Sequence, residues 1–496
     1  FLPYAHSEML VARAADEEVR NYWMAARESI CDGDVEARRS GRPGHWMTWL
    51  LFHAEPLAEK KRPIAFAPNP VLGGKGIGVL RTGSRPDGAA ALLRYGPAHN
   101  HGHLDDLNLN YYALGRELTY DLGYTLGSAH VQTGWSHVTA SHNLVVVNEK
   151  SQMRQPGGGG SAHLYLDAAP VRAFEASSEA SYSSEKVETY RRTLALVDVP
   201  AGSYLVDVFR VVGGSRHDQM WHFAGELAKV EGAAMGDIQT TGSLAGSEFD
   251  WGRKVGASGD LIGCADKGPY WVAPPGNGYG FLYDVRRSAS LGGECAAVWS
   301  VNPKGAETLT LRLLPEPATE LITARGPGIL PNLPNADYAI LRRRGERLRS
   351  DFVSVLEASR GASRVRSARR LEPQTDTPGA VGVEVQTEQG TDYILSAMDP
   401  VPTEFVTSSG DTIRFAGRFA FIRTAGGKAA DAVLAGGTEL EFGSTRLSAA
   451  SGEHTGTLTA VDPERSRITL SEPLPAELAG QFIYLDAPGY SHNSPY

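Results

Sequence analysis

Hydrophobic positions follow two different periods along the chain. Within residues 7–54, apolar side chains in "SEMLVARAADEEVRNYWMAARESI" recur close to every 3.6 residues, which predicts a helix, and "GHWMTWLLFHA" predicts a second, shorter one. From about Pro63 this period gives way to short runs of alternating apolar and polar residues, separated by Gly, Pro, Asp and Ser, which predict strands. A few helices cannot bury their apolar faces alone, so we expect them to pack against further structure.

The predicted strands are short and numerous. The clearest alternating runs are "DLNLNYYAL", "ELTYDLGY", "HNLVVVNEK", "YRRTLALVDV", "YLVDVFRVV", "DQMWHFAGEL" and "TLTLRLLPE". Their spacing favours a mainly β protein with a large antiparallel structure, a β-sandwich or stacked sheets. Between the first two runs, Gly115–Arg116 is typical of a two-residue hairpin turn.

The pattern of the sequence changes again near residue 396. "AMDPVPTEF" is punctuated by prolines, the later strands are shorter and richer in glycine, and "GTLTAVDPERSRITLSEPLP" predicts a hairpin. We therefore predict a helical segment at 1–60, an antiparallel β-sandwich domain at 61–398 and a small C-terminal β domain at 399–496. No repeat of fixed period is visible.

Composition narrows the class of protein. Of the 496 residues, 42% are hydrophobic and 21% charged, as in ordinary globular proteins. The net charge of −9 disfavours nucleic acids and anionic membranes as partners, although a local basic cleft could still bind an acidic polysaccharide. No apolar run is long enough to span a membrane.

The cysteines and the N-terminal residues say little about location. Three widely spaced cysteines do not suggest a disulfide framework, although one bond stays open. "FLPYAHSEML" lacks a basic stretch followed by an apolar one, so no signal peptide is visible; a processed protein and a fragment both stay open.

Histidines cluster in one short part of the chain. Six of the fourteen lie within less than a tenth of the sequence: His99, His101, His103, His130, His137 and His142. Histidine is the commonest metal ligand and titrates near neutrality, so the cluster indicates a metal site, an acid/base site or both, against the alternative of a polar loop. On an extended segment, His-x-His places both rings on one face, about 6–7 Å apart.

The sequence spacing of these residues does not by itself bring them close enough to bind one metal ion. Asp121 and His142 are available as further ligands. However, a symmetric hairpin turn at Gly115–Arg116 would place Asp121 opposite Asn110 and leave His103 roughly 20 Å away. A β-bulge, a longer return strand or pairing of non-sequential strands would be needed to bring His103 close to Asp121.

The stretch "HGHLDDLNLNYYALGRELTYDLGY…SHNLVVVNEKSQ" resembles the β-sheet domain of the heparinase II/III-like polysaccharide lyases. The shared pattern is H-x-H-x-D, a strand, a Gly turn, Asp-x-Gly, and His-Asn before a Val-rich strand. The likeness is good over about 90–215 and loose elsewhere. Members of this family have an α/α toroid, then a large antiparallel β-sandwich, often then a smaller β domain. The resemblance implies that 7–54 are the last helices of a toroid whose greater part is absent from this sequence.

The resemblance also implies a site and a reaction. The family's zinc ligands correspond to His103, Asp121 and His142, where the Zn²⁺ shapes the wall of the active site. The implied reaction is β-elimination on a uronate-containing acidic polysaccharide, which leaves 4,5-unsaturated uronate ends. The family's catalytic histidine corresponds to His101, and Tyr124 is a candidate second catalytic tyrosine of the cleft.

Two further residues are candidates for substrate binding. Asn100 could donate to the uronate carboxylate, and Trp135 could stack on a sugar face. The alternatives are turn chemistry for Asn100 and core packing for Tyr124 and Trp135. We expect His222, in an apolar run, to be a satisfied core histidine. Six basic residues could line a cleft for an anionic polymer or simply be solvated: Arg94, Arg116, Lys150, Arg154, Arg191 and Arg192.

Other functions stay open at this point. One is a noncatalytic, metal-stabilised carbohydrate-binding β module; another is a glycoside hydrolase of similar architecture. A hydrolase needs two carboxylates either about 5–5.5 or about 6.5–9.5 Å apart across a cleft, whereas adjacent Asp105 and Asp106 would point to opposite faces of a strand. The resemblance implies a polysaccharide or oligosaccharide substrate, a secreted or periplasmic location, and either a helical half elsewhere in the same protein or a homo-oligomer.

Overall fold

The computed structural model describes residues 10–11, 13–30, 71–72, 76–82, 88–96, 102–123, 129–154, 159–200, 202–258, 273–302, 306–328, 333–375, 377–462, 465, 467–475, 478 and 483. The chain divides into two compact units, 1–68 and 69–496, which we describe separately. The second helix predicted in "GHWMTWLLFHA" lies outside the described residues. None of the helices in the described ranges is long and apolar enough to cross a membrane.

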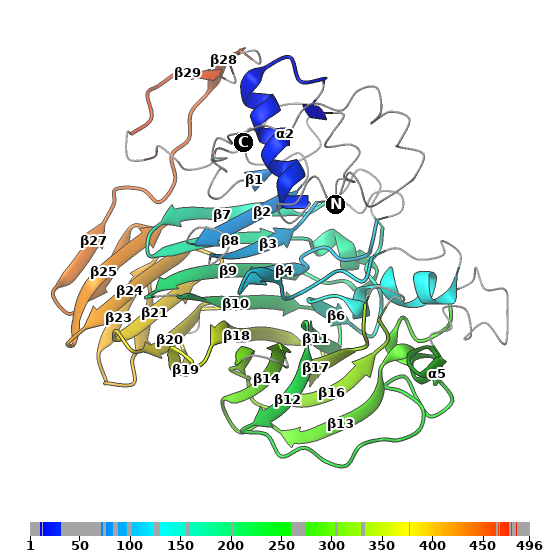
Figure 1. The fold of residues 1–496 in the computed structure, drawn as a ribbon. Coiled ribbons are helices and arrows are strands. Elements are labelled where there is room, and N and C mark those ends of the chain that lie inside the picture. Colours follow the sequence, from blue (N-terminus) through cyan, green and yellow to red (C-terminus); the bar gives the residue numbers. More distant parts are fainter. Residues whose placement is uncertain are drawn as a thin grey trace. The chain divides into compact units, whose positions relative to one another are not determined.

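The first unit contains the helix α2 (Glu17–Ile30), drawn in blue in Figure 1. Asp16 caps it, because its Oδ1 accepts the backbone N–H of Val19 at 2.9 Å. Glu17 and Glu18 occupy the first turn and Arg27 the last, which suits the helix dipole. The helix predicted from the apolar period is therefore present in this stretch.

The second unit is built from antiparallel sheets, each named here by one strand. The β3 sheet has the order β1 (Val71–Leu72), β2 (Ile77–Thr82), β3 (Ala89–Arg94), β4 (Leu109–Ala113) and β5 (Arg116–Glu117). The β10 sheet has the order β12 (Glu226–Glu231), β14 (Cys295–Asn302), β15 (Glu307–Leu313), β18 (Arg349–Arg360), β10 (Gly202–Val212), β9 (Thr189–Val199), β8 (Val171–Ser177) and β7 (Ser161–Ala168).

Four further sheets follow the same antiparallel pattern. The β17 sheet has the order β13 (Tyr283–Ser290), β16 (Glu320–Gly326), β17 (Ala336–Arg344), β11 (Arg216–His222) and β6 (Val145–Val147). The β21 sheet has the order β19 (Val365–Leu371), β20 (Val381–Thr387), β21 (Thr391–Ser396), β24 (Phe419–Ala425) and β25 (Lys428–Ala435). The β23 sheet has the order β22 (Thr403–Val406), β23 (Thr412–Ala416), β26 (Glu439–Phe442) and β27 (Thr445–Ser448), and β28 (Leu458–Asp462) pairs with β29 (Arg467–Leu470).

Short helical segments connect some of these strands. They are the π-helix η2 (Gln132–Ser136), the 3-10 helices η3 (Thr139–Ser141), η4 (Glu179–Glu185) and η5 (Tyr279–Phe281), and the α-helix α5 (Trp251–Ser258). Two of them, η2 and η3, lie between Asp121 and β6, in the part of the chain that carries the candidate site.

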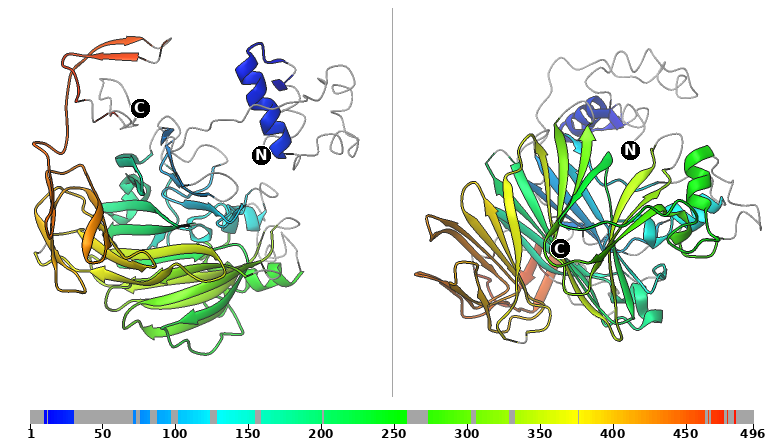
Figure 2. Two further views of the ribbon diagram at one scale, coloured as in Figure 1. Left: turned by 60° about the vertical axis from the view of Figure 1, so that its left-hand side comes forward. Right: turned by 90° about the horizontal axis from the view of Figure 1, so that it is seen from below.

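The larger sheets lie in layers (Figures 1 and 2), and three hydrophobic cores lie between them. Along β10, Leu205 and Phe209 face a core shared with the β3 and β17 sheets, whereas Val206 and Val208 face a core shared with the β21 sheet. The far face of the β21 sheet packs against the β23 sheet. Strand residues alternate between faces, so a strand buried on both sides reads as a continuous apolar run, as "YLVDVFRVV" does. The expected mainly β, antiparallel sandwich is confirmed.

The predicted border at 398/399 falls between β21 and β22. The β21 sheet takes strands from both sides of this border, because β24 and β25 follow it in the chain. The division into 1–60, 61–398 and 399–496 stays a prediction.

The hairpin between β4 and β5 differs from the expectation by one residue. Its turn is Leu114–Gly115, with φ of 57° and 79°, and Ala113 pairs with Arg116. A two-residue turn of this hand needs positive φ at both positions, which Gly115 provides and Leu114 tolerates. The return strand ends at Glu117, since the N–H groups of Leu118 and Thr119 both donate to the Tyr111 carbonyl. The predicted turn at Gly115–Arg116 and the long strand "ELTYDLGY" were wrong.

One buried cation joins the β10 sheet to the loops that contain Leu107 and Asn143. The Arg192 guanidinium on β9 bonds both carboxylate oxygens of Asp207 on β10, at 2.7 and 3.2 Å, and neither side chain is exposed. It also donates to the carbonyls of Leu107, at 2.7 Å, and Asn143, at 2.6 Å. A charge in a dry core is tolerable only with such partners, so Arg192 fixes these loops on the sheet.

Arg192→Met is expected to destabilise the protein by about 3–5 kcal/mol, because Asp207 would stay buried without its counter-charge. The matched control is Arg116→Met, which removes an ion pair with Glu307 in which the Arg116 side chain is 42% exposed. That change should cost at most about 1 kcal/mol. Denaturant unfolding of both variants measures the difference; equal losses would contradict this role of Arg192.

Candidate functional site

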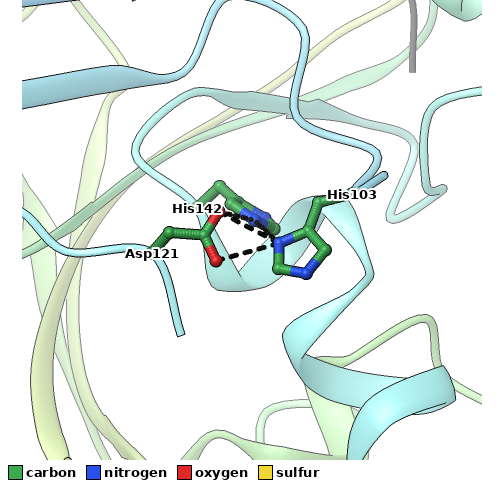
Figure 3. A group of neighbouring side chains, drawn as sticks. All are labelled: His103, Asp121 and His142. Carbon is green, nitrogen blue, oxygen red and sulfur yellow. Dashed lines mark hydrogen bonds and ion pairs between the residues drawn. The ribbon is translucent and has the colours of Figure 1, made fainter. Parts of the chain in front are cut away.

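Three side chains that are distant in the sequence lie close together in the structure. His103 lies in the loop before β4, Asp121 follows the β4–β5 hairpin, and His142 comes directly after η3. Figure 3 shows the two imidazoles and the carboxylate pointing toward one another. One donor atom from each lies within 4.8 Å of the other two.

The distances within this group suit a metal ion. His103 Nδ1 lies 3.0 Å from each Asp121 oxygen and 3.1 Å from His142 Nε2, and His142 Nε2 lies 3.5 Å from Asp121 Oδ2. Tetrahedral zinc with bonds of about 2.0–2.2 Å holds its ligand atoms roughly 3.3–3.6 Å apart. The group therefore needs only a small expansion to hold such an ion, and His and Asp are donors that zinc accepts.

Surrounding hydrogen bonds orient two of the three donors. His142 Nδ1 lies 2.9 Å from the Val138 carbonyl, which can only accept, so this nitrogen carries the proton and Nε2 presents its lone pair to the group. Asp121 Oδ1 accepts the N–H of Gly123 at 2.7 Å. The His142 side chain is 2% exposed, whereas that of Asp121 is 37% exposed. The group thus has one wall in the protein core and one side open.

The charges of the group favour the ionised carboxylate. Burial alone would raise the pKa of Asp121, but hydrogen bonds and charges from His103 and His142 hold that pKa well below its usual range. Burial alone would lower the pKa of His142, but the Asp121 carboxylate raises it above its ordinary value. Asp121 is therefore present as a carboxylate, the form that binds metals.

A turn explains how His103 reaches Asp121. The chain before β4 is folded back: the N–H of Asn108 donates to the Asp105 carbonyl at 2.9 Å, and Leu107 has a φ of 66°. The estimate of roughly 20 Å assumed that this segment continues the strand, and it fails for that reason.

Asp105 and Asp106 support this turn. Asp105 forms an ion pair with Arg94, and Asp106 Oδ2 accepts the hydroxyls of Ser178 at 2.9 Å and Ser181 at 2.8 Å. Both carboxylates are buried and committed to structural partners. They lie in a turn beside the same Arg94 guanidinium and not on opposite faces of a strand, so the reason given against a hydrolase pair does not apply.

Several predicted residues are placed otherwise or not at all. His99, His101, Asn100 and Tyr124 lie outside the described residues. Trp135 is fully buried: its indole N–H donates to the Pro327 carbonyl at 2.9 Å and its ring stacks on Phe281. Of the two roles considered for Trp135, the structure shows core packing, because no face of the ring is left for a sugar.

Most of the basic residues considered for a polymer cleft have carboxylate partners. These ion pairs are Arg94–Asp105, Arg116–Glu307, Arg191–Glu175 and Arg192–Asp207. Lys150 and Arg154 are exposed, and Arg154 lies beside the loop that carries His103.

Two asparagines were not anticipated in their roles. The N–H of Asn143 donates to Asn108 Oδ1 at 2.9 Å, and Asn143 Oδ1 accepts the N–H of His222 at 2.7 Å. The only sequence signal was the position of Asn143 next to His142. His222 is buried as expected, stacked on Tyr338, but its Nδ1 has no hydrogen-bond partner among the described residues. His222 also has a hydrogen bond to the Ser141 backbone, so it is the core histidine that was expected, with one of its two ring nitrogens unpaired.

Part of the chain matches a known protein family. Residues 76–261 match the family "Heparinase II/III-like, C-terminal", and this range contains all three side chains of the group. This region resembles heparinase II/III-like C-terminal domains. The resemblance seen in the sequence is thus confirmed for these residues.

Individual relatives are distant. An alginate lyase of Stenotrophomonas maltophilia (strain K279a) is 26% identical over 195 residues, which cover 34% of this chain and 26% of that protein. The heparan sulfate lyase HepC from Pedobacter heparinus is 11% identical with a TM-score of 0.46, covering 77% of this chain and 48% of that one. A heparinase III gene product is 13% identical, also with a TM-score of 0.46, covering 68% of this chain and 44% of that one. The chain therefore spans about half or less of these relatives.

His222→Phe is expected to reduce the acid sensitivity of the protein. Burial lowers the pKa of His222 to about 3, so between about pH 6.5 and 3 the unfolded chain binds a proton there that the folded chain does not. Stability due to this residue falls as pH falls, by about 2 kcal/mol between pH 7 and pH 5. Denaturant unfolding in chelator at both pH values should show a loss that is larger in the parent protein than in the variant by this amount, because His163 and His217, whose pKa burial also lowers, contribute equally to both.

The control for this experiment is His454→Phe, because His454 is exposed. It should keep the pH dependence of the parent protein. An unchanged dependence in His222→Phe would contradict the assignment.

Proposed function

We propose that the protein is a polysaccharide lyase that cleaves a uronate-containing acidic polysaccharide by β-elimination and leaves 4,5-unsaturated uronate ends. The observation that carries this proposal is the convergence of His103, Asp121 and His142 inside the heparinase II/III-like domain. The distant alginate lyase relative, which by its name acts on a polysaccharide, supports the substrate class.

The elimination requires three kinds of group. A base removes the proton at C5 of the uronate, donors stabilise the charge that grows on its carboxylate, and the bond from C4 to the leaving oxygen breaks as the C4–C5 double bond forms. His101, two residues before His103, is the proposed base or charge stabiliser. Asn100 is the proposed donor to the carboxylate, and Tyr124, three residues after Asp121, the proposed second tyrosine of the cleft.

His103, Asp121 and His142 are the proposed ligands of a structural Zn²⁺. When bound, the ion would supply a cross-link between three chain segments. The protein's own contribution is to hold the donor atoms in place: His142 through the Val138 carbonyl and Asp121 through the Gly123 N–H.

The remaining assignments are proposals of the same kind. We propose the domain borders given above, with residues 1–60 as the end of an α/α toroid. The location is proposed as secreted or periplasmic. Further acid/base groups would come from a helical half of the same protein or from a homo-oligomer, because the chain spans only part of its relatives.

The full chain is expected to raise the ultraviolet absorbance of uronate polymers, because elimination creates a conjugated double bond. His101→Ala should abolish this signal and keep the metal content. New reducing ends without the absorbance would indicate hydrolysis, and binding without either would indicate a carbohydrate-binding module. Full elimination activity in His101→Ala would contradict the catalytic assignment.

The purified chain is expected to hold close to one equivalent of zinc, measured by elemental analysis. His103→Ala and His142→Ala should each lose it, because two remaining ligands do not hold zinc firmly. Exposed His454→Ala is the control and should retain it. Unchanged metal content in both ligand variants would contradict the proposed site.

A further inference from the structure

His137 lies beside the proposed ligand His103. The two rings meet edge to face, with centroids 5.9 Å apart. His137 Nε2 lies 2.5 Å from the carbonyl oxygen of Gly102, the residue before His103, and the backbone carbonyl of His137 accepts the N–H of Leu104, the residue after it, at 3.0 Å. His137 therefore contacts the peptide on both sides of His103 and the ring of His103 itself.

The neighbours of His137 Nε2 determine where its proton lies. A carbonyl oxygen only accepts, so a separation of 2.5 Å from Gly102 is favourable only if Nε2 carries the proton and donates it. Arg154 Nη2 also lies 2.8 Å from His137 Nε2, but both nitrogens are then donors, so this contact is not a hydrogen bond. Arg154 Nη2 donates instead to the same Gly102 oxygen, at 3.0 Å. Because a carbonyl oxygen has two lone pairs, it can accept from His137 and Arg154 together.

A third bond ties this loop to the segment of His142. The Thr139 hydroxyl donates to the Leu104 carbonyl at 2.8 Å. The segment 137–142 thus holds residues 102–104 through hydrogen bonds on both sides of His103, and it also presents His142 to the site. The relative position of the two histidines depends on these bonds.

We propose that His137 and Arg154 form a clamp on the Gly102 carbonyl that positions His103 for metal binding. This proposal rests on the proposed metal site and adds two positioning residues to it. Fixing the Gly102–His103 peptide removes a backbone rotation that would otherwise swing His103 Nδ1 away from Asp121 and His142. Residues that orient a metal ligand in this way typically change metal affinity by about 10–100-fold when replaced.

Two replacements of His137 separate its hydrogen bond from its ring contact. His137→Phe keeps a ring beside His103 and removes the N–H donor, whereas His137→Gln places an amide N–H near the position of Nε2. We expect His137→Phe to weaken zinc affinity by about 10-fold or more and His137→Gln to restore most of it. Affinity is measured on the full chain by competition with a chromogenic chelator.

A second readout separates positioning from a general loss of stability. The unfolding temperature is compared in zinc and in chelator, because a ligand that binds only the folded state raises it according to its affinity. The clamp predicts that this zinc-dependent rise is smaller in His137→Phe than in the parent protein. The exposed variant His454→Gln should show the parent's rise.

The outcomes distinguish the clamp from the metal site on which it depends. If the parent protein binds zinc and His137→Phe binds it equally well, the clamp is wrong and the metal site stands. If the parent protein binds no zinc, the metal site itself is wrong, and the clamp falls with it. Reduced affinity in His137→Phe, restored by His137→Gln, supports the clamp.

Discussion

The arrangement of the site depends on the buried guanidinium of Arg192. It is held by Asp207 on the neighbouring strand and reaches two carbonyls, one four residues after His103 and one next to His142. Water cannot replace any of these partners inside the core, so a shift of either loop would leave a buried charge incompletely bonded. The β10 sheet thereby sets the position of loops that contribute no strand to it.

Polar contacts of a second kind act between the loops themselves. Asn143 joins the entry of β4 to the end of β11, and the Thr139 hydroxyl reaches the segment that bears His103. These bonds are short-ranged and directional, whereas the apolar contacts of the hydrophobic cores are not directional. The layered cores supply the stability of the domain, and the hydrogen bonds supply the precision of the site.

Much of the fold was predictable from the sequence, and the geometry of the site was not. Alternating runs such as "YRRTLALVDV" and "YLVDVFRVV" indicate strands because burial on a pleated sheet imposes a period of two. The hairpin turn was misplaced by one residue because Leu114 adopts positive φ. Leucine rarely does so, and the sequence therefore does not predict it. The approach of His103 to Asp121 was not derivable from spacing, since it depends on the fold-back at Leu107 and on Arg192, a residue far along the chain. Trp135 shows the same limit, because an aromatic residue for the core and one for a sugar look alike in a sequence.

The sequence separation of the three donors has a consequence for the order of folding. His103 and His142 are 39 residues apart, and the arginine that fixes their loops lies a further 50 or 49 residues beyond His142 and Asn143. Closing such loops carries an entropic cost that is offset only when the β9–β10 hairpin and its core are in place. A metal ion arriving during synthesis would therefore find no assembled ligand set. Capture of the proposed ion would therefore be a late event that follows the folding of the sheets.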